Sequence, residues 1–191
     1  MKICLFGGSF DPVHSGHLTI AEAAVQACGL DRVIFLPAAE SPFKQGKAHL
    51  FSDAQRTELL RLATAHAPWA EVSELDLQLP PPSWSWRLAE HFHKTYPEAQ
   101  LCWLLGTDQW QELHRWARYD YLRERLHFIV YHRGEAPQPR KGVRSTFIAG
   151  HHPAAATEIR RALTHGAPLP EGWMPDAVEQ RAREMVKAQS C

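Results

Sequence analysis

The sequence predicts an α/β protein with a doubly wound, mostly parallel sheet. Three observations support this prediction: short apolar runs that end at glycine or proline, amphipathic helical patterns between these runs, and a regular alternation of the two along the chain. The chain has 191 residues, of which 45% are hydrophobic and 22% charged. That is enough apolar surface for one sizeable core. We therefore expect residues 1–191 to form a single domain.

The first 36 residues predict a βαβ unit. Residues 2–6 (KICLF) form a short apolar run that a double glycine ends, which is typical of a buried strand. A mostly apolar helix is expected from residue 16 to residue 28, with Gly29 as its left-handed C-terminal cap. Residues 32–36 (RVIFL) then form a second strand, which we expect to lie parallel to the first.

The alternation continues to the C-terminus, and in such a sheet ligands bind outside the carboxyl ends of the strands. Further strands are expected at 69–73, 100–105, 127–131 and 145–149, and polar or rigid loops at 39–48, 79–83 and 134–142. Helices are expected from a Ser52/Gln55 capping box to Pro68, from a Ser83 cap through Phe92, over Trp110 and Leu113, around 159–163, and from Pro175 at a first helical position through Val186.

Charge and cysteine content narrow the choice of partners and compartment. The chain has 21 basic and 21 acidic residues, so no long-range field would recruit a nucleic acid or an anionic membrane. Residues 115–144 are locally basic; a solvated arginine-rich face is the favoured interpretation and an anion-binding surface the alternative. Four cysteines without a CxxC pair, no signal peptide and no apolar run near 18 residues favour reduced thiols and a cytoplasmic protein.

The segment after the first strand has the composition of a phosphate site. It reads Gly7-Gly8-Ser9-Phe10-Asp11-Pro12-Val13-His14-Ser15-Gly16-His17. The glycines permit close approach to the backbone, and the helix that begins near Gly16 offers unpaired N–H groups and a positive dipole end. His14 and His17, three residues apart, add two imidazoles. A surface pair and a metal site are the alternatives, but zinc would need a third ligand that this stretch does not obviously supply.

This segment resembles the signature of the HxGH-class nucleotidyltransferases, in the wording of the bacterial nicotinate-nucleotide adenylyltransferases. The resemblance implies a Rossmann-like nucleotidyltransferase fold with C-terminal helices. It extends over most of the chain, through residues 36–44 (LPAAESPFK), 82–85 (PSWS), 106–108 (GTD) with Trp116, and 155–160 (AATEIR).

The resemblance implies adenylyl transfer from ATP to nicotinate mononucleotide, which gives deamido-NAD and pyrophosphate in NAD biosynthesis. A phosphate is already an adequate nucleophile, so the protein needs only to align the substrates and neutralise charge. Mg2+ is expected as a cofactor carried with ATP, without a protein metal site. The sequence does not report oligomeric state, so a homo-oligomer stays open.

The same resemblance assigns the site residues. Three residues are implied as catalytic, and several more as contacts of the two substrates. The catalytic residues are His14, His17 and Arg160; the other ATP contacts are Gly7, Gly8, Ser9, Phe10, Lys44 and Thr157; the nicotinate-nucleotide contacts are Trp84, Ser85, Asp108 and Trp116. The alternatives are a surface lysine for Lys44, a core indole for Trp116, a helix cap for Thr157 and a solvated helix face for Arg160.

The sequence departs from the family pattern in its C-terminal motif. Alanines 154 and 155 stand where the family has isoleucine and serine, so one hydroxyl is lost. Trp84 and Ser85 replace tyrosine and threonine but keep the chemical type. His151 and His152 resemble a metal-binding dipeptide, but in a loop before a proline we expect solvent-facing polar residues.

Other functions remain open at this stage. The same chemistry could act on nicotinamide mononucleotide or phosphopantetheine. The alanine at 155 raises the alternative of a nucleotide-binding protein that has lost turnover. A nucleic-acid binder using residues 115–144 is a third alternative, which the zero net charge disfavours.

Overall fold

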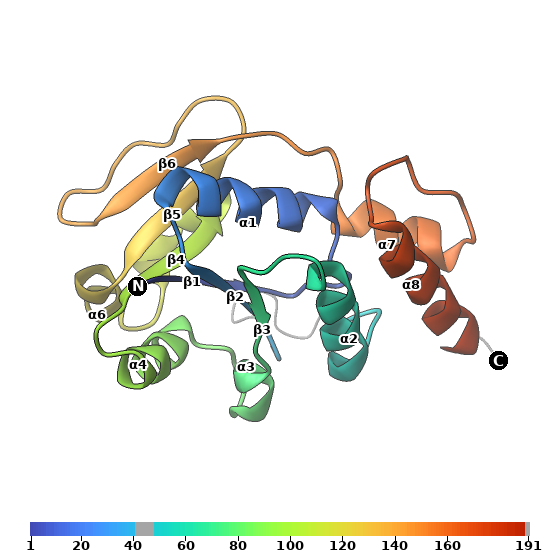
Figure 1. Ribbon diagram of the computed structural model, residues 1–191, viewed down its shortest axis with the longest axis horizontal. Coiled ribbons are helices and arrows are strands. Elements are labelled where there is room, and N and C mark those ends of the chain that lie inside the picture. Colours follow the sequence, from blue (N-terminus) through green and yellow to red (C-terminus); the bar gives the residue numbers. More distant parts are fainter. Residues whose placement is uncertain (41–47, 190–191) are drawn as a thin grey trace.

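The computed structural model describes residues 1–40 and 48–189, which form a three-layer arrangement of helix, sheet and helix (Figure 1). Six parallel strands lie in the order β3-β2-β1-β4-β5-β6. Their bounds are β1 (Lys2–Gly8), β2 (Arg32–Pro37), β3 (Ala70–Val72), β4 (Gln100–Gly106), β5 (His127–His132) and β6 (Ser145–Ala149). The predicted doubly wound fold is confirmed, and the strand order reverses between β1 and β4, where ligands bind in such sheets.

Helices cover both faces of the sheet. Side chains alternate along β1, so that Cys4 and Phe6 join one core cluster while Ile3 and Leu5 join the other. The first cluster lies under α1, α2, α7 and α8, and the second under α4, α5 and α6. The bounds are α1 (Ser15–Cys28), α2 (Asp53–Thr64), α3 (Leu75–Gln78), α4 (Ser85–Thr95), α5 (Thr107–Gln111), α6 (Tyr119–Arg125), α7 (Ala156–Thr164) and α8 (Asp176–Gln189), with a 3-10 turn at Leu113–Arg115.

Two predicted helix ends are confirmed. Gly29 caps α1 with φ of 59°, the left-handed conformation that glycine adopts without a steric penalty. At the start of α2, the Gln55 N–H donates to the Ser52 hydroxyl and the Ser52 N–H donates to the Gln55 side chain, at 3.3 and 2.9 Å. These local hydrogen bonds depend on nearby residues alone, which is why the sequence could predict them.

Other helix predictions were wrong in detail. Ser83 does not cap α4; its hydroxyl accepts the Glu40 N–H at 3.2 Å, and Trp84 occupies the N-cap without a side-chain bond. Pro175 directly precedes α8 instead of taking its first helical position. The short helices α3 and α6 were not predicted. Both are too short to show a helical period in the sequence.

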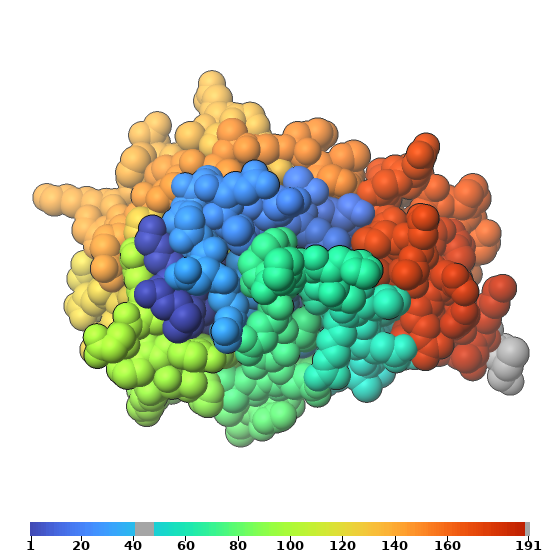
Figure 2. All heavy atoms as spheres, in the orientation of Figure 1, coloured from blue at the N-terminus to red at the C-terminus, as the bar shows by residue number. Residues whose placement is uncertain are grey.

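The C-terminal helices pack at the end of the molecule beside α2 (Figures 1 and 2). Arg181 of α8 donates to the Glu58 carboxylate of α2 at 2.6 Å, and the Gln189 amide donates to the Leu50 carbonyl at 3.4 Å. The described C-terminal residues therefore form part of the same folded body as α2. Within the described residues, no helix combines the length and the apolar character needed to cross a membrane.

A fully buried arginine joins the ends of β1 and β2. The Arg56 guanidinium donates to the Ser9 carbonyl at 2.5 Å, to the Ala38 carbonyl at 2.8 Å and to the Asp53 carboxylate at 2.6 Å. The Arg56 side chain has no exposed surface. A charge this deep is tolerated because these acceptors replace much of the water it has lost, while its Nε–H has no hydrogen-bond partner among the described residues.

We expect Arg56→Ala to lower the free energy of unfolding by about 2–4 kcal/mol, because it leaves two carbonyls without a donor and opens a cavity. Urea unfolding measures this loss. Arg61→Ala on the exposed side of α2 is the matched control, since Arg61 makes only a surface ion pair with Glu74 and should cost about 0–1 kcal/mol. Equal losses for the two variants would contradict the special importance of the buried guanidinium.

Candidate functional site

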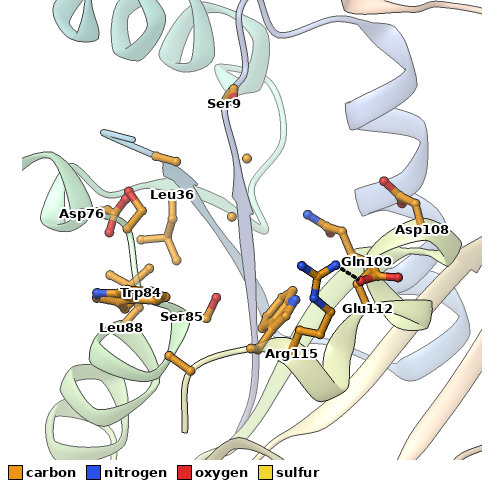
Figure 3. A pocket seen from close by; sticks show the side chains of 16 residues that line it. Ser9, Leu36, Asp76, Trp84, Ser85, Leu88, Asp108, Gln109, Glu112 and Arg115 are labelled. Atoms are coloured by element: carbon orange, nitrogen blue, oxygen red, sulfur yellow. Dashed lines mark hydrogen bonds and ion pairs between the residues drawn. The ribbon is translucent and has the colours of Figure 1, made fainter. Parts of the chain in front are cut away.

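A pocket of about 660 Å³ opens at the carboxyl ends of β1, β2 and β4. Figure 3 shows its two walls: Trp84, Ser85 and Leu88 face Gln109, Glu112 and Arg115, with Ser9 and Leu36 toward the sheet. The walls come from α4 and from the segment that follows β4. The described residues that line the pocket are Gly7, Gly8, Ser9, Leu36, Ala38, Asp76, Ser83, Trp84, Ser85, Leu88, Asp108, Gln109, Glu112, Arg115, Trp116 and Ala117.

Trp116 is a core residue, as one of the two interpretations of the sequence had it, and it also lines the pocket. It is 9% exposed and meets Trp103 edge to face at a centroid distance of 5.8 Å, so it belongs to the second core cluster. Its indole N–H has no hydrogen-bond partner among the described residues. The pocket is thus bounded by an aromatic side chain that the core holds in place.

Asp76 is a pocket residue that the sequence did not indicate. Its carboxylate accepts the Ala39 N–H at 3.2 Å and the Ser83 hydroxyl. Burial raises the pKa of Asp76, and these two hydrogen bonds oppose that rise. The buried carboxylate holds the loops after β2 and before α4 together, which fixes the wall that carries Trp84.

A stack of arginine side chains and aromatic rings connects the two walls of the pocket. The Arg118 guanidinium lies 4.6 Å from the Trp86 ring and 4.7 Å from the Tyr121 ring, while Arg125 lies 4.2 Å from Tyr121. Arg118 has φ of 56°, an unfavourable conformation for a side chain with a Cβ. Cation–π contacts on both sides offset part of that cost. Trp86 and Arg118 directly follow Ser85 and Ala117, which line opposite walls of the pocket.

Several arginines of the basic stretch at 115–144 make ion pairs or hydrogen bonds within the chain. Arg115 pairs with Glu112 at 2.5 Å, and Arg123 pairs with Asp120 at 2.7 Å. Arg140 and Arg144 donate to backbone carbonyls. The favoured interpretation of a solvated arginine-rich face therefore fits the structure better than a continuous anion-binding surface does.

The two histidines of the signature lie together at the N-terminus of α1. The His14 N–H donates to His17 Nδ1 at 3.3 Å, and the two rings stack at a centroid distance of 3.8 Å. Because Nδ1 of His17 accepts, a neutral His17 carries its proton on Nε2 and can donate it to a ligand. A methyl group on Gly16 would come within 3.0 Å of the His14 ring. The glycine of this signature therefore makes room for the imidazole.

His14 is neutral at physiological pH. Its side chain is buried, and its Nδ1 has no hydrogen-bond partner among the described residues. Burial lowers the pKa of His14 to about 4, with smaller contributions from the neighbouring charges of His152 and Arg133. A buried, unpartnered ring nitrogen beside a helix N-terminus is an arrangement that can receive an anion.

The C-terminal motif meets the N-terminal motif at Asp11. Arg160 donates to the Asp11 carbonyl at 2.7 Å and to the Thr157 hydroxyl at 3.3 Å. The Asp11 carboxylate accepts the N–H groups of Leu50 and Phe51, each at 3.0 Å. Residues 149 positions apart in the sequence thus share one hydrogen-bonded group. Thr157 is exposed, and Arg160 keeps part of its guanidinium open to solvent.

The departure at Ala155 has a visible structural consequence. Ala155 is the N-cap of α7, with φ of −133° and no side-chain cap bond, and it is exposed. A serine at this position would both cap the helix and present a hydroxyl. With alanine at 155, the chain has neither the cap bond nor the hydroxyl at this position.

The predicted site residues fall into two groups. Gly7, Gly8, Ser9, Trp84, Ser85, Asp108 and Trp116 line the pocket; His14, His17, Thr157 and Arg160 lie beyond it, around the N-termini of α1 and α7. The Phe10 side chain is buried and packs edge-on against Phe6, so it supports the loop and leaves only its backbone for a ligand. Lys44 lies outside the described residues.

The expectation that His152 faces solvent was wrong. His151 is exposed, but His152 is half-buried and its Nδ1 accepts the Ala154 N–H at 3.1 Å. A methyl group on Gly16 would lie 3.5 Å from His152 Nδ1, so His152 flanks the start of α1 together with His14. Within the described ranges no group of three His, Cys, Asp or Glu side chains is placed to hold a metal ion.

Comparison with known proteins agrees with this geometry. Residues 5–162 match the family model of cytidylyltransferase-like proteins. A protein of Methylacidiphilum infernorum named probable nicotinate-nucleotide adenylyltransferase is 36% identical over 191 residues, covering 96% of this chain and 90% of the relative. One of Neisseria meningitidis serogroup C with the same name is 36% identical, covering 87% and 91%.

The chain belongs to the nicotinate-nucleotide adenylyltransferase family. Solved structures with the same fold include a nicotinic acid mononucleotide adenylyltransferase of Plasmodium falciparum, complexed with NaAD in one case and with APC in another. Their TM-scores are 0.78 and 0.76, at 15% identity, and each covers 96% of this chain and 95% of its own. At that identity they support the fold, while the close relatives establish the family.

The buried His14 of this family member makes its stability depend on pH. Its pKa is lower in the folded chain than the ordinary 6.5, so the folded state binds this proton less readily than the unfolded state does. The free energy of unfolding that depends on a neutral His14 is fully present above pH 6.5 and is lost as the pH falls toward about 4. At about pH 4.5 we expect the wild type to have lost about 2 kcal/mol more than His14→Gln has, relative to neutral pH.

Urea unfolding at both pH values measures this difference. Replacement of the exposed His66 by glutamine is the control and should leave the pH dependence of the wild type in place. Parallel curves for wild type and His14→Gln would mean that His14 is protonated as readily in the folded chain as in the unfolded chain.

Proposed function

We propose that this chain, acting as one domain, transfers the adenylyl group of ATP to nicotinate mononucleotide and releases pyrophosphate. The observation that carries the proposal is the short distance between two parts of the signature segment. Gly7, Gly8 and Ser9 line a pocket with an aromatic wall and a hydroxyl at Ser85. The next residue, Phe10, meets the ring of His17 at a centroid distance of 5.0 Å, and His17 lies beside His14 at a helix N-terminus. One substrate presents phosphates and the other a flat acidic ring, and the two parts of the site match these two chemistries.

The reaction needs alignment and charge neutralisation. An oxygen of the acceptor's 5′-phosphate attacks the α-phosphorus of ATP, a new P–O bond forms, and the bond to the β-phosphate breaks with its electrons leaving on pyrophosphate. His17 donates its Nε2–H to the α-phosphoryl oxygens, where charge gathers. Neutral His14 and the first N–H groups of α1 contribute further donors. Thr157 and Arg160, at the start of α7, are proposed to hold the departing phosphates.

Ser85 and the aromatic residues are proposed to select the acceptor. The Ser85 hydroxyl donates to a carboxylate, whereas an amide presents its own N–H groups to the same donor and is mismatched. Trp84 and Trp116 offer ring surface for the pyridine, and Arg115 places a cation on the opposite wall. Asp108, exposed at the pocket rim, is the candidate contact for a ribose hydroxyl.

Magnesium is proposed to enter as part of the MgATP substrate. The described residues contain no cluster of three metal-ligating side chains. With nucleotides, Mg2+ usually keeps several waters and is bound mainly through the substrate phosphates. Lys44 stays a predicted contact of the ATP phosphates.

The proposal is tested by measuring pyrophosphate release from MgATP with three acceptors in parallel. We expect nicotinate mononucleotide to be preferred over nicotinamide mononucleotide, and phosphopantetheine to be inert. A preference for the amide would overturn the assignment of Ser85. ATP binding without turnover on any of the three acceptors would instead support the nucleotide-binding protein that the alanine at 155 first suggested.

We expect His17→Ala to lower turnover with nicotinate mononucleotide by about 10²-fold or more, the usual effect of losing one transition-state donor. Thermal unfolding should change little, because His17 is only half-buried. His66→Ala, at an exposed histidine, serves as the control and should retain full turnover. Full turnover in His17→Ala would show that another group neutralises the charge at the α-phosphate.

A further inference from the structure

A third histidine lies at the phosphate side of the site. His152 belongs to the segment between β6 and α7, which passes the N-terminus of α1. His14 and His152 both approach Gly16, where an added methyl group would lie 3.0 Å from the His14 ring and 3.5 Å from His152 Nδ1. The ring of His17 lies 3.8 Å from that of His14, centroid to centroid. Three imidazoles therefore converge on one helix terminus, and the signature accounts for only two of them.

The hydrogen bonds of His152 fix which ring nitrogen is available. Its Nδ1 accepts the Ala154 N–H at 3.1 Å, so neutral His152 carries its proton on Nε2. Nε2 has no partner among the described residues. The side chain is half-buried, whereas its neighbour His151 is exposed. A donor is thus held in one orientation with nothing from the described chain to accept its hydrogen bond.

The surroundings of His152 are cationic or neutral. The charged and titratable groups that face it are His14 from the start of α1, Arg133 from the end of β5 and its own neighbour His151. Arg133 is exposed and has no acidic ion-pair partner in the described part of the chain. Such a group of donors without an acceptor is complementary to an anion.

The buried ring of His14 provides an independent indication of a ligand here. Its side chain is 7% exposed, and its Nδ1 lacks a hydrogen-bond partner among the described residues. Unpaired buried polar atoms are costly and uncommon, and a ligand that accepts hydrogen bonds from this cluster would account for one. The arrangement does not form a metal site in the described chain.

We propose that His152 is a further nucleotide-binding residue that donates its Nε2–H to the phosphate chain of ATP. This inference rests on the proposed function for the identity of the anion. It also bears on the alanine at 155, because this N-cap residue of α7 has no hydroxyl and His152, three residues earlier in the chain, offers a donor instead. No bond to the chain is made or broken, and His152 acts by hydrogen bonding alone.

Calorimetric titration of MgATP and of a non-hydrolysable ATP analogue into three variants tests this proposal. His152→Ala removes the donor and should weaken binding about tenfold, the usual worth of one hydrogen bond to a charged group. His152→Gln keeps an N–H at comparable reach and should recover most of the affinity. His151→Ala is the matched control in the same loop and should bind as the wild type does. Thermal unfolding of each variant establishes that it is folded.

A second measurement does not depend on the variants. In a long-range ¹H–¹⁵N spectrum of the wild-type imidazoles, the Nε2 signal of His152 should shift on addition of MgATP, while that of His151 should stay in place. Equal ATP affinity for wild type and His152→Ala, or an equal loss in His151→Ala, would overturn the inference, as would an unmoved His152 signal. Failure of the proposed function would look different, because ATP would still bind while nicotinate mononucleotide gave no pyrophosphate.

Discussion

The buried guanidinium of Arg56 is the interaction on which the site most depends. It is fully enclosed and donates to carbonyls at the ends of β1 and β2, within the two loops that the pocket and the histidine pair share. Parallel strands leave such carbonyls without ladder partners where the chain turns away from the sheet. One rigid, multiply donating group from α2 satisfies both and sets the distance between the loops. The Gly7–Ser9 segment can then stay open to a ligand, because the buried Arg56 holds it through the Ser9 carbonyl.

A second constraint brings distant parts of the chain to the same point. Asp11 accepts two N–H groups from residues 50–51 with its carboxylate and receives the Arg160 guanidinium at its carbonyl. Arg160 is therefore held by the Asp11 carbonyl at 2.7 Å and lies 3.8 Å from the Asp11 carboxylate, and part of its guanidinium stays exposed. The phosphate side of the site is assembled from the start of α1 and the start of α7, and each contributes a positive helix end. This explains how a chain with zero net charge can attract a polyphosphate without a basic surface.

The sequence predicted what depends on local pattern. The six strands, the Gly29 cap, the Ser52 capping box and the signature at 7–17 follow from residues close in the chain, and all were placed within a few positions. It could not predict the interactions that tertiary packing creates. Asp76, Arg56 and the Arg118 stack each join elements that are distant in sequence. His152 does lie in a loop, but it does not face solvent as expected, because its neighbour in space, His14, is not its neighbour in the chain. The prediction that Ser83 caps a helix was wrong for the same reason, since its hydroxyl accepts the N–H of the distant Glu40.

The neutral state of His14 decides how the site can respond to its substrate. A permanently charged imidazole at this depth would need an acid beside it, and that acid would repel phosphate. Burial instead keeps the ring uncharged, because loss of water lowers its pKa to about 4. Arg133, which is exposed, and Arg160, which is partly so, supply fixed positive charge at the edge. In the proposed reaction, His14 and His17 therefore act as preorganised donors, and the fixed positive charge comes from the arginines.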